Sequence, residues 1–346
     1  MRFVGNKTQL LESIKEVVDK HVVNAHSFCD IFSGTASVAR FFKQWYEVCS
    51  NDLLYFSYCL QRATIENPKK PGFETLFQGA GIQNPISYFN DMATDSMESL
   101  AKQKRFFQNN YAPLGGRMYI TDANALRIDF ARNTIEEWNR AGLLSENEYY
   151  YLVASVVEGI PFVSNISGTY GAFNKTWDVR SNKLFKLIDL PVVCNGLNNR
   201  SYNEDGAKLL QRICGDILYI DPPYNERQYL PNYHVLETAA KYDFPALRGV
   251  TGQRPYEGQR SDFCSKKTVV GAFDALLENA RFKHIILSYN TDGIMTLDEI
   301  ETTMKKHGVA ATFEVNYIPY RRFKSKSIVT RTEELKEMLI YIQKEV

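Results

Sequence analysis

Four apolar residues in D-I-L-Y-I are followed directly by Asp221, Pro222, Pro223 and Tyr224. Each proline lacks an N–H and fixes its own φ, so a strand has to end at this point. The Asp221 carboxylate and the Pro222 carbonyl could accept hydrogen bonds from both N–H groups of an exocyclic amine and draw its nitrogen towards tetrahedral geometry. The ring of Tyr224 could stack on a base lifted from its helix. These residue types therefore indicate chemistry on an aromatic amine, with a simple turn as the alternative.

Three more acids are expected at the carboxyl ends of strands, where open parallel sheets bind ligands. Asp30 ends the first predicted strand, Asp52 the second and Asp205 a short third. After Asp30, the turn F-S-G-T-A can bring backbone close to a ligand at Gly34. Asp52 is placed to accept from ribose hydroxyls and Asp205 from an adenine amino group, although either acid could instead cap a helix. Asp122 competes for the adenine role, but a turn accounts for it.

The order of predicted elements supports a parallel sheet that holds these acids. After an amphipathic helix over residues 6–21, strand, turn, helix, strand and helix alternate, as in βαβ winding. The alternation stops over residues 63–200, where residues 118–129 resemble a hairpin, and it resumes at 201. The last two predicted strands suggest an antiparallel hairpin. We therefore predict an α/β domain formed by 1–62 and 201–346, with 63–200 as an inserted, mainly helical and loop domain.

Composition and charge limit the classes of protein to which the chain can belong. The chain has 346 residues, 44% of them hydrophobic, as expected for a folded globular protein, and its net charge is +1. Positive charge gathers locally, because residues 316–331 carry five basic residues and no acid, which indicates either solvated surface or a polyanion contact. The six cysteines lack zinc-ligand spacing, so no metal is expected. The sequence has no long apolar run, so neither an export signal nor a membrane span is expected. The protein is therefore predicted to be cytoplasmic.

Several motifs together resemble the adenine-N6 DNA methyltransferases of the Dam-like class, in which a recognition region separates the cofactor loop from D-P-P-Y. The resemblance includes G-N-K-T-Q-L-L, D-I-F-S-G-T-A, the pair Asn51 and Asp52, N-E-D-G, and Y-I-D-P-P-Y-N-E-R-Q-Y with N-Y-H-V-L-E-T behind it. The extended last motif is far more specific than its tetrapeptide and looks like a restriction-modification companion enzyme. The resemblance implies a Rossmann-like methyltransferase sheet and S-adenosylmethionine as cofactor. Ala36 departs from the family, which often has a second glycine there.

The resemblance also implies residue roles. Lys7 and its neighbours would contact the methionine end of the cofactor, Asp52 would hold the ribose, and Asp205 would contact the adenine. The catalytic candidates are Asp221, Pro222, Pro223 and Tyr224. The cofactor-binding candidates are Phe3, Gly5, Lys7, Asp30, Phe32, Ser33, Gly34, Asp52, Asp205 and Asp221.

DNA contacts are expected mainly from the insertion, at residues 161–200. There, basic and aromatic side chains stand among glycines and asparagines, and arginine can bind guanine while lysine binds phosphate. Solvated loop residues are the alternative. The DNA-binding candidates are Tyr170, Lys175, Arg180, Lys183, Arg227, Arg321, Arg322 and Lys324.

The sequence thus predicts methyl transfer to N6 of an adenine flipped from double-stranded DNA, in a prokaryotic cytoplasm and associated with the nucleoid. Methylation of RNA adenine or protein glutamine, or a non-catalytic DNA-binding subunit with the same fold, are the alternatives. A nicotinamide-dependent oxidoreductase is disfavoured because G-x-G-x-x-G is absent. No nuclease signature is evident, so a cognate restriction endonuclease would be a separate protein.

Overall fold

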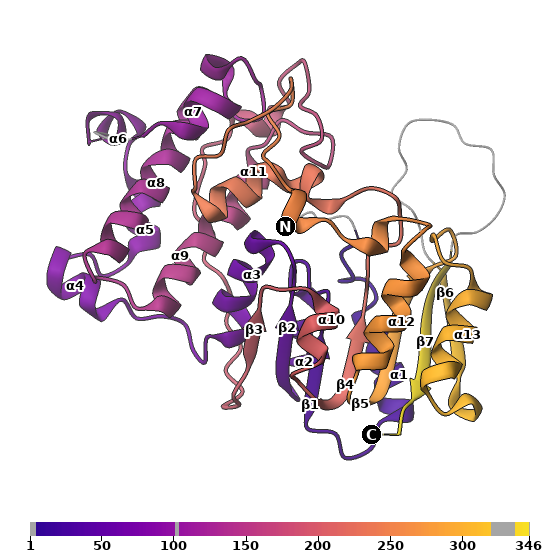
Figure 1. Ribbon diagram of the computed structural model, residues 1–346. Helices are drawn as coiled ribbons and strands as arrows, with labels where there is room; N and C mark the ends of the chain where they lie inside the picture. The colour runs from indigo at the N-terminus through magenta and orange to yellow at the C-terminus, as the bar shows by residue number, and fades with distance from the viewer. Residues whose placement is uncertain (1–4, 101–103, 320–335, 346) are drawn as a thin grey trace.

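A seven-stranded sheet forms the centre of the computed structural model, which describes residues 5–100, 104–319 and 336–345 (Figure 1). Its strand order is β3-β2-β1-β4-β5-β7-β6. The first five strands of that order pair in parallel, whereas β7 is antiparallel to both β5 and β6. This confirms the predicted α/β class with its antiparallel C-terminal hairpin. The strands are β1 Ser27–Asp30, β2 Glu47–Asn51, β3 Arg200–Tyr202, β4 Gly215–Ile220, β5 Phe282–Asn290, β6 Glu314–Pro319 and β7 Lys336–Gln343.

The strand order reverses between β1 and β4, which are neighbours in the middle of the sheet. Cys29 of β1 lies opposite Cys49 of β2 on one side and Leu218 of β4 on the other. At such a switch point, the connections that leave neighbouring parallel strands diverge and open a crevice for ligands. Asp30 ends β1 and Asp221 follows β4, so both acids border this crevice.

Helices cover both faces of the sheet. On one face, side chains of β1, β4, β5 and β7 share a core with α10, α12 and α13; on the other, the core includes α1 and α2. These helices are α1 Leu11–His21, α2 Ser37–Phe42, α10 Gly206–Leu210, α12 Val269–Asn279 and α13 Leu297–His307. Both faces being apolar explains the near-continuous hydrophobic strands in the sequence.

A second body of helices, here called the helical region, lies at the upper left of the sheet in Figure 1. Its core combines residues from α3, from the predicted insertion and from α11, which follows D-P-P-Y. The predicted boundaries at 63 and 200 remain a prediction, although α3 and α11 on either side of them pack into this core. Its helices are α3 Tyr55–Gln61, α4 Glu74–Ala80, α5 Pro85–Asp91, α6 Thr94–Leu100, α7 Phe106–Tyr111, α8 Asp122–Arg140, α9 Glu146–Gly159 and α11 Tyr229–Lys241.

One predicted element is wrong. Residues 118–129, expected to form a hairpin, instead lead into helix α8. The Thr121 side chain caps this helix by accepting from the N–H of Asn124, and Asp122 accepts from the N–H of Leu114. Asp122 therefore has a structural role, but at the first position of a helix and not in the turn that the sequence suggested.

Short helical turns complete the fold: η1 Arg62–Glu66, η2 Pro113–Gly115, η3 Ile160–Phe162, η4 Val179–Asn182, η5 Glu257–Gln259, η6 Asp262–Cys264 and η7 Ala310–Thr312. Across the ranges that the structure describes, none of the helices has the length and apolarity needed to cross a membrane.

Candidate active site

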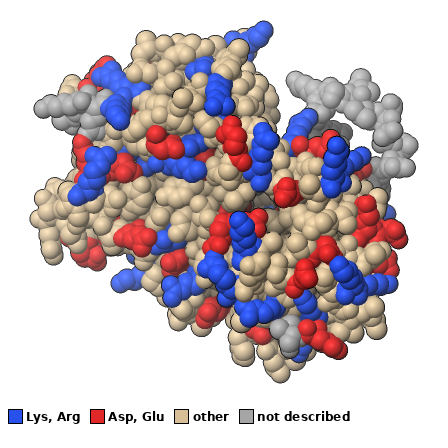
Figure 2. All heavy atoms as spheres, viewed as in Figure 1, with Lys and Arg blue, Asp and Glu red and all other residues tan. Residues whose placement is uncertain are grey.

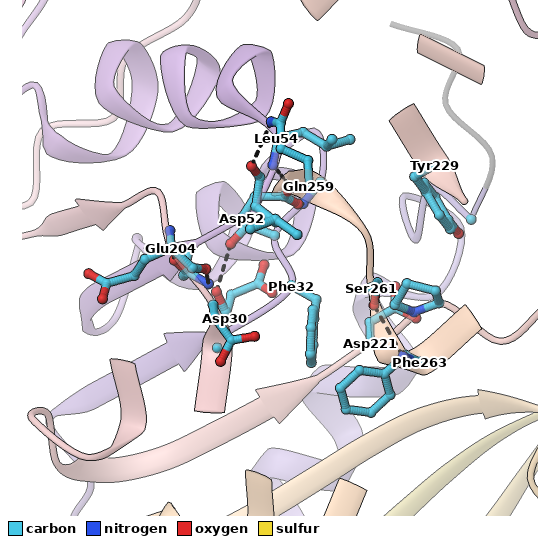
Figure 3. A pocket seen from close by; sticks show the side chains of 18 of the residues that line it. Asp30, Phe32, Asp52, Leu54, Glu204, Asp221, Tyr229, Gln259, Ser261 and Phe263 are labelled. Atoms are coloured by element: carbon cyan, nitrogen blue, oxygen red, sulfur yellow. Dashed lines mark hydrogen bonds between the residues drawn. The ribbon is translucent and has the colours of Figure 1, made fainter. Parts of the chain in front are cut away.

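A cavity of about 250 Å³ lies at the carboxyl ends of β1, β2, β3 and β4. Figure 3 shows Asp30, Asp52 and Asp221 around it, each from a different strand end. The cavity brings together Gly5, Lys7, Asp30, Phe32, Ser33, Gly34, Asp52, Asp205 and Asp221, which are all of the cofactor candidates within the described residues. Phe3 lies outside those residues. Their roles stay predictions, but their assembly in one cavity is what those roles require.

Asp30 presents an acceptor without a partner. Its Oδ2 accepts from the N–H of Ala39 at 3.2 Å, and its backbone carbonyl accepts from the Ser33 hydroxyl at 2.8 Å. Its Oδ1 is buried and has no hydrogen-bond partner in the described protein. Burial, reinforced by the nearby Asp221 carboxylate, raises the pKa of Asp30 to about 8. A ligand with a positive charge or a donor would satisfy this oxygen.

The turn after Asp30 uses left-handed backbone at two positions. Gly34 has φ +50° and Ala36 has φ 59°. A glycine adopts such values without steric penalty, so the left-handed backbone at Ala36 fits the expectation of a second glycine there. Ala36 is fully buried, so its methyl group contributes to the core beside α2.

Asp52 is held by backbone on both oxygens. Its Oδ2 accepts from the N–H of Gly34 and its Oδ1 from the N–H of Leu54, each at 2.8 Å (Figure 3). Burial raises the pKa of Asp52 to about 6, although these two hydrogen bonds oppose the rise. Each carboxylate oxygen keeps a second lone pair, so Asp52 can still accept from ligand hydroxyls.

Asp205 both lines the cavity and starts a helix. Its side chain accepts from the N–H of Lys208 at 3.0 Å and so caps α10, as one of the two sequence interpretations predicted. The adjacent Gly206 lets the backbone at the start of α10 approach the Ile31 side chain closely, because a Cβ there would lie 3.1 Å from Ile31 Cγ1. The predicted contact of Asp205 with adenine stays a prediction.

The loop over residues 257–264 forms a wall of the cavity that sequence reasoning missed. Phe263 meets Phe32 edge to face, with ring centroids 5.1 Å apart. Ser261 and Gln228 exchange two hydrogen bonds, of 2.8 and 3.0 Å, which fasten the loop to the segment after D-P-P-Y. Gln259 donates to the carbonyl of Leu53. The loop follows no strand end, so the pattern that identified the acids could not identify it.

Lys7 joins Asp221 to a second carboxylate, Glu337. Its Nζ lies 3.2 Å from Asp221 Oδ1 and also donates to Glu337 Oε1. Burial would lower the pKa of Lys7, but the two carboxylates raise it well above its usual range. Burial raises the pKa of Asp221 to about 7, and Lys7 opposes the rise. Lys7 is predicted to contact the methionine end of a cofactor. The structure shows that it also contacts the catalytic candidate Asp221.

The other D-P-P-Y residues are close by. Pro222 is buried and Pro223 lines the cavity. The carbonyl of Tyr224 accepts from the N–H of Ile294 at 3.1 Å, and Lys7 Nζ lies 5.6 Å from the centre of its ring. At Gly5, with φ +82°, a Cβ would contact the Tyr224 hydroxyl at 3.7 Å. The N-terminal segment therefore packs directly against D-P-P-Y.

The comparisons with known proteins agree with this geometry. A family model described as D12 class N6 adenine-specific DNA methyltransferase matches residues 3–303. The chain belongs to this family. It is 46% identical to type II methyltransferase M.FokI of Planomicrobium okeanokoites, over 100% of this chain and 53% of that protein. It is 42% identical to modification methylase StsI of Streptococcus sanguinis, over 99% of this chain and 52% of that protein.

Coverage differs among the relatives. The chain spans about half the length of the two methylases just described. It matches type II methyltransferase M.NlaIII of Neisseria lactamica at 34% identity over 99% of this chain and 98% of that protein. The family thus implies a methyl donor for the cavity at the strand ends.

The DNA-binding candidates of this D12-class chain differ in their exposure to solvent. Lys175, Lys183 and Arg227 are exposed, and Arg180 is paired with Asp178 at 2.8 Å. Tyr170, expected at the surface, is only 1% exposed, and its hydroxyl lies 2.9 Å from that of Ser164. Its ring therefore belongs to the core and is not available to DNA in this structure. Arg321, Arg322 and Lys324 lie outside the described residues.

The buried Tyr170 has a structural role that sequence reasoning did not foresee. Its N–H donates to the carbonyl of Asn232 in α11, and its own carbonyl accepts from the Tyr119 hydroxyl, each at 2.8 Å. The loop that carries Lys175 and Lys183 is therefore fastened to the helix that follows D-P-P-Y. Basic and acidic side chains alternate over the face shown in Figure 2, so charge alone does not mark a DNA path there.

Proposed function

We propose that this chain transfers a methyl group from S-adenosylmethionine to N6 of an adenine flipped out of double-stranded DNA, as the modification enzyme of a restriction-modification system. The observation that carries the proposal is the position of D-P-P-Y: Asp221 lines one cavity together with Asp30 and Asp52, at the point where the strand order reverses. Membership of the D12 family and the names of the relatives support the same reaction.

The residues present suit S-adenosylmethionine. This molecule carries a sulfonium and an ammonium, and the cavity lining is rich in carboxylates, with Asp30 Oδ1 lacking a partner. Asp52 would accept from the ribose hydroxyls, Asp205 would accept from the adenine amino group, and Phe32 with Phe263 would flank the adenine ring. When bound, the cofactor supplies an electrophilic methyl group.

The protein's part in the reaction is positioning and electrostatics. The Asp221 carboxylate and the Pro222 carbonyl accept from the target amine and turn its lone pair towards the methyl donor. Only the ionised carboxylate offers two acceptor oxygens, so the Lys7 ammonium at 3.2 Å assists by favouring that form. Tyr224 stacks on the flipped base.

The helical region is proposed as the part that recognises the target, with residues 63–200 as its main contribution. The exposed Lys175, Lys183 and Arg227 would contact DNA on the side of α11. The proposal includes a cognate restriction endonuclease as a separate protein and a prokaryotic cytoplasm where chromosomal DNA is the substrate.

The test is transfer of tritium from labelled S-adenosylmethionine to duplex DNA, RNA and protein in parallel. A duplex without adenine serves as the control. The expected result is label in adenine-containing duplex alone, recovered as N6-methyladenine. Label in RNA or in protein glutamine would overturn the proposal, and so would DNA binding without any transfer.

A further inference from the structure

Glu337 is a buried carboxylate that belongs to no motif and lies beyond residues 3–303, which match the family model. It stands on β7, opposite Asn290 of β5, and is 2% exposed. It accepts from the Ser288 hydroxyl at 2.8 Å and from the Lys7 ammonium. A buried carboxylate is costly unless it is paired and hydrogen-bonded, and these two donors provide both.

Glu337 is not among the residues that line the cavity, yet it is connected to the reacting group through one side chain. Lys7 Nζ contacts Asp221 on one side and Glu337 on the other. Two carboxylates from different strands thus share one ammonium, which leaves a net charge of −1 when all three are ionised. If Glu337 were neutral, Lys7 would cancel the charge of Asp221.

We propose that Glu337 is a positioning residue for methyl transfer: it holds Lys7 beside Asp221 and offsets the ammonium charge, so that Asp221 faces the target amine as a net anionic acceptor. The inference rests on the function proposed above. An attacking amine gains positive charge as its bond to the methyl group forms, so a net negative site stabilises the transition state more than a neutral one.

The ionisable groups around Asp221 come from several elements. Lys7 reaches it from the N-terminal segment, Glu337 from β7 and Asp30 from β1. The phenols of Tyr219 and Tyr229 also interact with Asp221, and the phenol of Tyr224 interacts with Lys7. Burial is the main reason for the raised pKa of Asp221, and the charge of Glu337 raises it further. Loss of that charge should therefore lower the pKa of Asp221.

The test is Glu337→Gln, which keeps the size and an acceptor oxygen but removes the charge. We expect kcat at saturating DNA and cofactor to fall roughly 10- to 100-fold, because a small misplacement of catalytic groups has effects of that order. The acid limb of the kcat–pH profile should move to lower pH. Affinity for S-adenosylmethionine, measured by calorimetry without DNA, should stay within about threefold.

Two results would overturn the inference. The first is a folded Glu337→Gln variant whose kcat and pH profile match those of the wild type. The second is an increased KM for S-adenosylmethionine at unchanged kcat, since this would mean that Glu337 only anchors the N-terminal segment. The proposed function fails separately, if the wild-type protein itself transfers no methyl group to duplex DNA.

Two further variants keep the test decisive. Glu148→Gln removes another buried carboxylate, which accepts from the N–H of Phe73 in the helical region. It should lower the melting temperature without moving the pH profile. If Glu337→Gln does not fold, Ser288→Ala removes the hydroxyl that orients Glu337 while leaving every charge in place. We expect a several-fold loss of kcat, and an unchanged kcat in Ser288→Ala would contradict the inference.

Discussion

Two buried cations illustrate how differently the sheet and the helical region use charge. Arg127 in α8 is 2% exposed and donates to the carbonyls of Phe185, Met92 and Phe89 at 2.7–3.1 Å. Lys7 is 4% exposed and contacts two carboxylates instead. Neutral carbonyls satisfy the guanidinium and fix chain segments to α8, whereas the carboxylates around Lys7 leave a net negative charge beside a cavity.

The difference teaches that burial of a cation does not by itself mark a functional site. The groups that contact the cation decide whether the site is functional, because a cation that backbone carbonyls satisfy leaves no charged group free to bind a ligand. At the cavity, burial raises the pKa of both Asp30 and Asp221, and Asp30 Oδ1 remains without a partner. Such incompletely satisfied carboxylates are typical of sites that bind a cationic ligand.

The largest expected effect is on the sheet side. Asp221→Ala should lower methyl transfer by about 10³-fold or more, because it removes one of the two acceptors that orient the amine. S-adenosylmethionine should still bind, as the other acids of the cavity remain. Tritium transfer and calorimetry measure the two properties separately. Unchanged methylation by this variant would exclude Asp221 as the acceptor.

In the helical region, the corresponding change affects stability instead. Arg127→Met leaves three carbonyls, two of them buried and one partly buried, without their donor and should lower the free energy of unfolding by about 3 kcal/mol. Urea denaturation measures this, with the exposed Arg140→Met on the same helix as control, expected within about 0.5 kcal/mol of the wild type. Folded Arg127→Met should bind S-adenosylmethionine normally. Loss of S-adenosylmethionine binding at an unchanged free energy of unfolding would contradict this contrast between Arg127 and Lys7.

A smaller effect concerns pH. Because the pKa of Asp30 is raised to about 8, the folded protein holds this proton more tightly than the unfolded chain does. The stability that the proton contributes is complete at low pH and is lost as pH rises from about 4 towards 8. Asp30→Asn cannot ionise, so its stability relative to the wild type should increase between pH 6 and pH 9 in urea denaturation. Parallel pH dependence of the two proteins would show that Asp30 is ionised when folded.

The smallest effects are expected at the exposed lysines of the helical region. Lys175→Ala and Lys183→Ala should each weaken duplex binding a few-fold and reduce the slope of log K against log salt by about one. Their affinity for S-adenosylmethionine should not change. Lys69→Ala, exposed but outside residues 161–200, is the control. Equal losses in all three variants would mean that the predicted segment has no special role in DNA binding.

The fold and the acids of the site were predictable because they follow from chain pattern. Asp30 ends a strand, Asp52, Asp205 and Asp221 come shortly after one, and parallel strands bring their carboxyl ends to one edge. The local helix start at Thr121 was missed, since a capping residue and alternating apolar residues also suit a hairpin.

Other residues could not be predicted, because tertiary packing alone determines their places. Tyr170 stands in a polar loop, yet its ring is buried and its backbone fastens the loop to α11. Phe263 reaches the cavity from a loop, and Glu337 reaches Lys7 across 330 positions of sequence. No local period or motif records contacts of this kind.

The most direct test of the central claim is a map of modified bases in DNA from cells that express this chain, compared with cells that express the Asp221→Ala variant. We predict N6-methyladenine at nearly every copy of one short sequence with the wild-type chain, and none with the variant. Modification of cytosine, methylation of RNA in place of DNA, or equal adenine methylation with both chains would contradict the account.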